Sequence, residues 1–239
     1  MMQAVVMAGG SGVRLSPYTS VIPKPLLPVD GMPIIEIIIK QLKNHGFNRI
    51  SLALGHLAEL IKVYLGDGAK YGVRLEYFVE KVPLGSIAPL ALVRNPEPCF
   101  LVMNADLLTN LNYADLIDCH RSNDAIATVG TYQLKVPIDL GVVETNGDSV
   151  ITGIREKPKV SFNVSMGVYA FDARVREYLR EDQRMDFPEL VETLVRNGEK
   201  VVSYVFRGYW LDIGRHSDYA KAIEEFRSMR RELNIDDPQ

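Results

Sequence analysis

An apolar segment runs directly into a glycine-rich turn near the start of the chain. Segment 4–7 has the pattern of a strand, and the turn that follows is GGSG at positions 9–12. Three glycines in four positions leave backbone N–H groups free to surround an anion, because no Cβ atom stands in the way. Arg14 then adds a planar fork of donors, and Lys24 adds a compact charge. A nucleoside triphosphate suits such a segment, although a glycine-rich turn can also be a plain connection between a strand and a helix.

Two common phosphate-binding motifs are absent from this region. No GxxxxGK[ST] pattern follows the strand, which excludes a P-loop nucleotide hydrolase. Gly10 and Gly12 are followed by Leu15 at the position where the dinucleotide fingerprint requires a third glycine. The turn therefore belongs to a different class of phosphate site.

The longer string VVMAGGSGVRLSPYTSVIPKPLLPV, at positions 5–29, resembles the N-terminal signature of the sugar-1-phosphate nucleotidyltransferases. That signature is GGxGTRLxPxTxxxPKPLxPV, and this chain departs from it at Val13, where the family usually has threonine. The resemblance implies that Arg14 and Lys24 are catalytic. It also implies nucleotide contacts from Ala8, Gly9, Gly10, Ser11 and Gly12.

Composition narrows the class of protein. A chain of 239 residues that is 47% hydrophobic can bury a sizeable core in one domain. The net charge of −3 and the lack of a basic run argue against nucleic acid as a partner. No apolar stretch approaches the length of a membrane span, and the N-terminus lacks the layout of a signal peptide. We expect a cytoplasmic enzyme that is not bound to a membrane.

Apolar runs and amphipathic stretches alternate through the first half of the chain. This alternation predicts an α/β protein with a mostly parallel sheet and helices on both faces. Short strands separated by turns follow in the second half, and they predict a small antiparallel lobe for a second substrate. The expected strands are 4–7, 50–54, 73–79, 99–103, 125–131, 141–144, 150–155, 164–171 and 201–206. The expected helices are 33–45, 57–65, 113–122, 186–197 and 217–231.

The resemblance covers nearly the whole chain, from residue 2 to residue 223. It implies a Rossmann-like three-layer fold with a mixed, mostly parallel central sheet. We expect a single catalytic domain, 1–239, with a nucleotide-binding half at 1–110 and a sugar-phosphate-binding half at 111–232. The polar end of the chain, 233–239, is expected to be frayed.

Asp106 follows the apolar run 100–103 and stands just past the end of a buried strand. Ligands of open α/β sheets bind beyond the carboxyl ends of strands, so a carboxylate here is well placed for a divalent ion. The local sequence is equally compatible with a helix N-cap. The segment resembles the family motif LVxN[GS]D, with Ala105 in place of glycine or serine. That resemblance implies that Asp106 binds Mg²⁺ and that Asn104 contacts the nucleotide.

Asp212 lies in the string GYWLDIG, which contains the single tryptophan of the chain. On its own the string could be a core aromatic residue followed by a turn. It closely resembles the family motif G[FY]WxDIG, whose aspartate is a second metal ligand. Because Mg²⁺ is typically held by one or two carboxylates together with substrate phosphates, Asp106 and Asp212 are the expected pair.

Three segments resemble those that line the sugar pocket of the family. Glu156-Lys157-Pro158 is similar to the EKP signature, which implies that Lys157 contacts the sugar phosphate and takes part in catalysis, and that Glu156 contacts a hydroxyl. The other two segments are similar to YGVV, with leucine at its first position, and to NAGxY. They imply sugar-side contacts from Gly141, Asn163 and Gly167.

The segment from residue 80 to residue 90 resembles the family element ExxPLGTAGPL and implies base contacts from Glu80, Pro83 and Gly85. An ionised carboxylate only accepts hydrogen bonds, and guanine offers it two adjacent donors, N1–H and N2–H₂. Glu80 therefore favours GTP. Ile87 and Ala88 depart from the family pattern, and the bulk of Ile87 is expected near the nucleotide.

Together the motifs are most similar to the mannose-1-phosphate and heptose-1-phosphate guanylyltransferase branches. The implied reaction is attack of a sugar 1-phosphate on the α-phosphate of an NTP, assisted by Mg²⁺, with release of pyrophosphate. The four histidines are scattered, and none is expected to be a catalyst. Members that use UTP, CTP or dTTP are the alternatives, as is a catalytically silent regulatory subunit that binds nucleotide sugars. The sequence is also compatible with a protein that forms a homo-oligomer.

Overall fold

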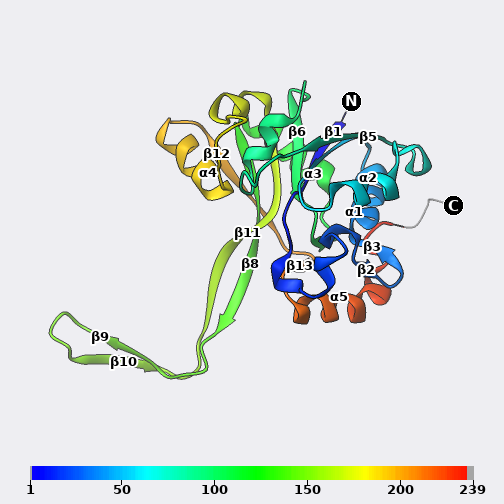
Figure 1. The fold of residues 1–239 in the computed structure, drawn as a ribbon. Coiled ribbons are helices and arrows are strands. Elements are labelled where there is room, and N and C mark those ends of the chain that lie inside the picture. Colours follow the sequence, from blue (N-terminus) through cyan, green and yellow to red (C-terminus); the bar gives the residue numbers. More distant parts are fainter. Residues whose placement is uncertain (1, 236–239) are drawn as a thin grey trace.

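The computed structural model describes residues 2–235 and contains a central sheet of seven strands (Figure 1). The strand order is β12-β8-β11-β6-β1-β4-β5. Neighbours run parallel except β11, which is antiparallel to both β6 and β8. The strands of this sheet are β1 Met2–Ala8, β4 Phe47–Leu54, β5 Arg74–Val79, β6 Cys99–Asn104, β8 Ala127–Pro137, β11 Lys159–Asp172 and β12 Val201–Phe206. The mixed, mostly parallel α/β sheet expected from the sequence is confirmed.

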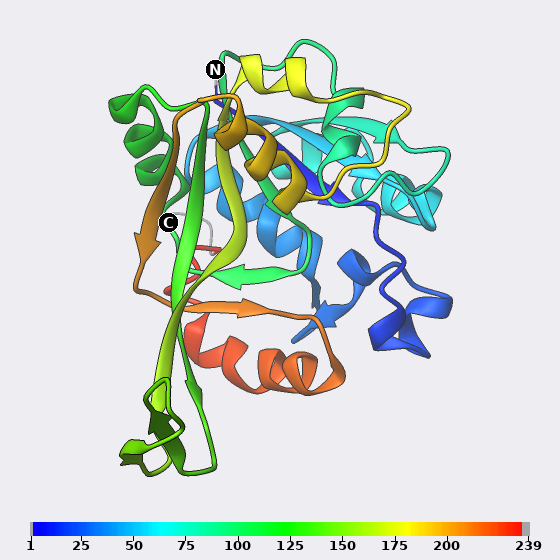
Figure 2. The same cartoon turned by 90° about the vertical axis from the view of Figure 1, so that its left-hand side faces the viewer.

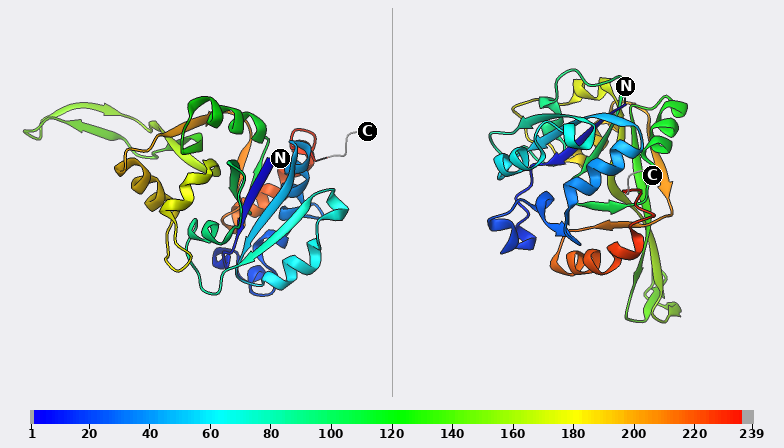
Figure 3. Two further views of the ribbon diagram at one scale, coloured as in Figure 1. Left: turned by 90° about the horizontal axis from the view of Figure 1, so that it is seen from above. Right: turned by 90° about the vertical axis from the view of Figure 1, so that its right-hand side faces the viewer.

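The helices cover both faces of the sheet (Figures 2 and 3). They are α1 Ile34–Asn44, α2 Ala58–Leu65, α3 Tyr113–Asn123, α4 Phe187–Arg196 and α5 His216–Met229. Short 3₁₀ segments join them: η1 Val13–Leu15, η2 Tyr18–Ser20, η3 Lys24–Leu26, η4 Ala69–Tyr71, η5 Ala88–Leu92 and η6 Ala173–Tyr178. Three two-stranded sheets complete the fold, formed by β2 Pro28–Val29 with β3 Met32–Pro33, β7 Leu107–Thr109 with β13 Trp210–Asp212, and β9 Val142–Thr145 with β10 Ile151–Arg155.

Strand β1 divides the core into two layers because its successive side chains point to opposite faces of the sheet. Val6 belongs to the apolar cluster formed with α1, α2, α3 and α5. Val5 belongs to the cluster formed with η5, η6 and α4. Both side chains are fully buried, as in parallel strands that are covered on both faces. The strand thereby fixes the position of the glycine-rich turn at its carboxyl end.

The antiparallel lobe takes the form of a long projecting arm rather than a compact unit. Beyond Tyr132, the last β8 residue paired with β12, strands β8 and β11 continue as a two-stranded ladder. The chain then forms the hairpin β9–β10, in which the Asn146 side chain accepts the N–H groups of Asp148 and Val150. We call residues 133–163 the arm. Figure 1 shows that it points away from the body of the protein.

The end of the described chain differs from the frayed tail expected from residue 233 onward. Leu233 and Ile235 are buried in the larger apolar cluster. The Gln41 amide of α1 donates a hydrogen bond of 2.7 Å to the Leu233 carbonyl and another of 2.7 Å to the Thr109 carbonyl. Apolar residues in an otherwise polar tail thus anchor it, and the remainder, 236–239, lies outside the described residues. Within residues 2–235, no helix has the length and apolar character needed to cross a membrane.

Candidate active site

Asp106 and Asp212 meet beyond the carboxyl end of β6. The short strand β7, which follows Asp106, pairs antiparallel with β13, and this register places Asp212 opposite Leu107. The Ile213 N–H donates a hydrogen bond of 2.9 Å to the Asp106 carbonyl. Two residues distant in sequence are therefore fixed side by side by backbone pairing.

Asp106 is not a helix cap, which was the alternative interpretation of its sequence. Asn112 caps the next helix, α3, by accepting the Ala114 N–H at 3.0 Å. Instead, the Asp106 Oδ2 atom accepts a hydrogen bond of 2.5 Å from the Lys24 ammonium. Its Oδ1 atom is buried and has no hydrogen-bond partner.

The surroundings of Asp212 raise the free energy of its ionised carboxylate. Partial burial raises the pKa of the Asp212 carboxyl, and the nearby Asp106 raises it further. Lys24 and Arg14 oppose this shift. The residue as a whole nevertheless stays exposed at the surface. Two carboxylates that raise the energy of one another, one with an unpartnered buried oxygen, form the kind of oxygen-donor site that suits a hard divalent cation such as Mg²⁺. No cluster of three or more His, Cys, Asp or Glu side chains that could hold a metal occurs within residues 2–235.

The glycine-rich turn packs directly over Lys24. Gly12 has φ +63°, a left-handed conformation that favours glycine, and a Cβ there would lie 2.9 Å from Thr19 Cγ2. Thr19 Oγ1 donates a hydrogen bond of 2.8 Å to the Gly12 carbonyl. Arg14 extends from the same segment toward the DIG motif, since a Cβ on Gly214 would lie 3.5 Å from its guanidinium nitrogens. The predicted catalytic residues of the N-terminal half thus converge with both aspartates.

A pocket opens next to this group of charges. It is lined by Met7, Gly9, Gly10, Glu80, Gly85, Ser86, Pro89 and Asn104. A second pocket, on the other side of Glu80, is lined by Gly9, Ser11, Gly55, His56, Glu80, Lys81, Val82 and Pro83. Most of the residues predicted to bind nucleotide line one of these two pockets.

Glu80 stands where the two pockets adjoin. Its Oε1 atom would lie 2.5 Å from a Cβ on Gly9 and 2.6 Å from a Cβ on Gly55. Position 55 needs glycine, because a Cβ there would also lie 2.6 Å from the Gly9 carbonyl oxygen. Its Oε2 atom accepts the Leu84 N–H at 2.9 Å. Our sequence reasoning missed Gly55 and His56. Their place directly after β4, the parallel neighbour of β1, was the signal that could have identified them.

The bulk of Ile87 does not face the nucleotide pocket, which corrects our expectation. The Ile87 side chain is buried in the smaller apolar cluster, and the neighbouring Ala88 is also fully buried. The backbone at Gly85 directs the following residues into the core. Gly85 has φ +97°, and a Cβ there would lie 2.5 Å from the Met185 carbonyl oxygen. The Ser86 N–H donates to Asp186 at 2.8 Å and holds the pKa of that carboxyl below its usual range. The loop is therefore attached to the start of α4.

The structure divides the predicted sugar-side residues into two groups. Gly167 lies at the site, since its φ is +73° and a Cβ there would lie 2.7 Å from Asn104 Nδ2. The remaining four, Gly141, Glu156, Lys157 and Asn163, are exposed residues of the arm. A Cβ on Gly141 would lie 3.2 Å from the Glu156 carboxylate, so these two are neighbours of one another. Gly141, Glu156 and Lys157 lie beyond the outer end of the β8–β11 ladder, in the part of the arm that points away from the body (Figure 1).

Comparison with known proteins identifies the family. A model of the nucleotidyl transferase family matches residues 3–228. The chain belongs to this family. Over 244 residues, which are 93% of the chain and 62% of the relative, it is 33% identical to UTP–glucose-1-phosphate uridylyltransferase of Synechocystis sp.. Over 224 residues, 91% of the chain and 62% of the relative, it is 29% identical to mannose-1-phosphate guanylyltransferase of Mycobacterium tuberculosis.

Solved structures of nucleotidyl transferases have the same fold. A Bacillus anthracis protein assigned as a glucose-1-phosphate thymidylyltransferase superposes with a TM-score of 0.76 at 26% identity, over 95% of this chain and 96% of that one. Its relatives thus include transferases named for three different nucleobases. The chain also spans less than two thirds of the length of the two curated relatives named above.

Proposed function

We propose that this nucleotidyl transferase joins a sugar 1-phosphate to an NTP and releases pyrophosphate. The observation that carries the proposal is the convergence of Asp106 and Asp212 with Lys24 and Arg14 beside a glycine-rich turn. In the reaction, an oxygen of the sugar phosphate forms a bond to the α-phosphorus of the NTP. The bond from that phosphorus to the oxygen leading to the β-phosphate breaks, and the electron pair leaves with pyrophosphate.

The site needs no general base for this reaction. A phosphate monoester has a second pKa of about 6, so it is largely a dianion at pH 7 and its oxygen is already a nucleophile. Catalysis then depends on positioning the two phosphates and neutralising their charge. The Arg14 fork suits the charge that develops on the leaving pyrophosphate, while the Lys24 ammonium suits the reacting phosphates.

Asp106 and Asp212 would hold Mg²⁺, which neutralises phosphate charge when it is bound. The unpartnered Oδ1 atom of Asp106 is the observation that supports this assignment. Lys24 pairs with the Oδ2 atom of Asp106. Its positive charge offsets the negative charge of this carboxylate, which would otherwise repel a triphosphate. The test is pyrophosphate release with and without Mg²⁺ for a panel of sugar 1-phosphates and NTPs. Absence of release from every pair would contradict the proposed activity and favour a silent nucleotide-sugar-binding subunit.

We further propose that GTP is the preferred nucleotide and that Glu80 selects it. Each carboxylate oxygen has two lone pairs, so Oε2 can accept a guanine donor while it keeps the Leu84 N–H. Uracil and thymine would place a carbonyl lone pair against the same carboxylate. A site built for hydrogen bonds can reject an analogue that lacks them by about 10⁴-fold.

The experiment compares kcat/KM for GTP, UTP, dTTP, CTP and ATP in wild type and in Glu80→Gln. Glu59→Gln is the matched control, because that side chain is exposed on α2. We expect GTP to lead in wild type and in the control, and its lead to collapse in Glu80→Gln. A wild-type preference for UTP or dTTP would refute this role, as would a base preference that Glu80→Gln leaves unchanged.

A further inference from the structure

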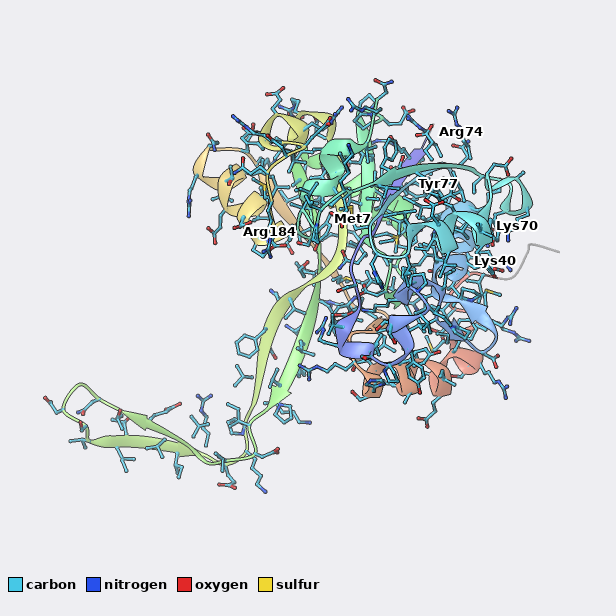
Figure 4. The ribbon with its side chains drawn as sticks, in the orientation of Figure 1. Met7, Lys40, Lys70, Arg74, Tyr77 and Arg184 are labelled. Atoms are coloured by element: carbon cyan, nitrogen blue, oxygen red, sulfur yellow. The ribbon has the colours of Figure 1, made fainter. Side chains whose placement is uncertain are left out.

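The arm exposes an unusual amount of apolar surface for a segment without covering elements. Strands β9 and β10 pair only with each other among the described residues. A two-stranded ribbon is marginally stable alone in water, and exposed apolar patches mark contact sites. Figure 4 shows the arm side chains standing clear of the body. The exposed apolar residues of the arm are Leu134, Val136, Leu140, Val143, Val150, Ile151, Ile154 and Phe162.

The base of the arm holds it away from the active site of its own chain. The β8–β11 ladder is unbroken from the Thr131–Ser165 pair to the Pro137–Lys159 pair. At about 3.3 Å per residue, this stretch of strand is about 20 Å long. Its inner end is anchored beside the site, since Gly167 contacts Asn104. Lys157, which lies beyond the outer end, is therefore remote from Asp106 of the same chain.

A second apolar surface lies at the rim of the active site. It is formed by segment 13–22, where exposed apolar side chains follow the glycine-rich turn. Those residues are Val13, Tyr18, Val21 and Ile22, with Val13 being 72% exposed and Val21 68% exposed. The arm cannot reach this rim within its own chain unless its ladder bends. A second copy has the same two surfaces and can bring them together.

The charge of the arm also favours a protein partner. Residues 133–163 contain four basic side chains, Lys135, Arg155, Lys157 and Lys159. They contain four acidic ones as well: Asp139, Glu144, Asp148 and Glu156. A ribbon with no net charge and apolar side chains on it does not suit a phosphate backbone or an anionic membrane, which both attract a basic surface.

We propose that two copies of the chain exchange arms. The arm of each copy seats on the apolar rim of the other and places Glu156 and Lys157 at the partner's Asp106–Asp212 site. The contact is isologous, because each copy offers the same arm and the same rim. This inference rests on the proposed function, and on the expectation from the family resemblance that Lys157 contacts the sugar phosphate. It makes the sugar half of each active site a contribution from the second copy.

The decisive experiment is complementation between two inactive variants. Asp106→Asn and Lys157→Ala are co-expressed with different tags, and mixed dimers are isolated by two successive affinity steps. With exchanged arms, one of the two sites in a mixed dimer combines an intact body with an intact arm. Pyrophosphate release should therefore recover to about half the wild-type rate, as the two-fold symmetry requires. If each site is built within one chain, both sites of the mixed dimer stay defective, and this result would overturn the proposal.

A measurement of association separates this inference from the proposed function. Sedimentation of wild type should show a dimer, and Ile154→Lys should shift it to a monomer. Val195→Lys is the matched control, because Val195 is an exposed apolar residue of α4, 58% exposed against 70% for Ile154. A monomeric wild type would refute the exchange of arms, as would a dimer that withstands Ile154→Lys. If wild type releases no pyrophosphate with any substrate pair, the proposed function fails, and sedimentation still decides whether the arms join two copies.

Discussion

Replacing each metal-site aspartate by asparagine should change stability in different ways, although both changes should abolish activity. Asp106 pairs with Lys24, which is only 9% exposed, so Asp106→Asn leaves a buried ammonium without its carboxylate. Asp212 has no such pair, and its surroundings raise its pKa, which means that its negative charge costs free energy at pH 7. Asp212→Asn removes that cost.

The magnitudes follow from these two environments. A hydrogen bond to a charged group contributes about 1.5–3 kcal/mol, and the Asp106 side chain is 23% exposed, so Asp106→Asn should lower the free energy of unfolding by that amount. For a chain of this length, 1 kcal/mol shifts Tm by about 2–4 °C, which gives a fall of roughly 3–12 °C. Asp212 is exposed and screened by solvent, so Asp212→Asn should leave Tm unchanged or raise it by a few degrees, on the order of 1 kcal/mol at most.

The assay is thermal unfolding at pH 7, first without and then with Mg²⁺ and a non-hydrolysable NTP. Wild type should gain stability from these ligands, because anything that binds only the folded state raises its free energy of unfolding. Both variants should lose most of that gain. If Asp212→Asn lowers Tm in the absence of ligand as much as Asp106→Asn does, the reasoning about Lys24 and the shared charge is wrong. Near-normal turnover with Mg²⁺ in either variant would refute the metal assignment.

Three further outcomes are expected. Arg14→Lys should lower kcat by about 100-fold, because one ammonium cannot reproduce the guanidinium fork, and a rise in KM alone would refute its role in the transition state. In a urea titration, Gly167→Ala should lower the free energy of unfolding by about 1–2 kcal/mol, because Gly167 has φ +73° and lies close to Asn104. Gly147→Ala is the control and should change this free energy little, because a Cβ at position 147 would meet open space. Ile87→Ala should lower the free energy of unfolding by about 2–5 kcal/mol in the same titration, because the Ile87 side chain is buried. If the variant keeps its stability and instead changes its nucleobase preference, the Ile87 side chain faces the nucleotide and this reasoning is wrong.

Much of the nucleotide half could be predicted from the sequence because its signals are local. The apolar run before the glycine-rich turn is a buried strand, β1, and the helix expected at 33–45 is α1, Ile34–Asn44. Asp106 stands just past the end of its strand, where ligands bind, but this position also suited a helix N-cap, and the family motif decided between the two. Family motifs supplied Asp212, whose position depends on a pairing between β7 and β13 that no local pattern reveals.

The arm was the feature that local patterns could not place. Short segments separated by turns correctly indicated antiparallel strands, but β11 begins at Lys159 and not at 164. Nothing in the sequence shows in which direction a two-stranded ribbon projects. The same limit applied to Ile87, because the direction of its side chain is set by contacts of Gly85 with Met185 on a distant segment. Leu233 and Ile235 looked like part of a polar tail, although packing against α1 orders them.

The fate of each phosphate of the NTP tests the central claim most directly. Wild type is incubated with Mg²⁺, a sugar 1-phosphate, and GTP or UTP that is radiolabelled at either the α- or the γ-phosphate. We predict that the α label appears in a nucleotide sugar and that the γ label appears in pyrophosphate, with both products absent in Asp106→Asn. Transfer of the γ label to the sugar phosphate, or no transfer from either position for any sugar phosphate, would contradict attack at the α-phosphorus.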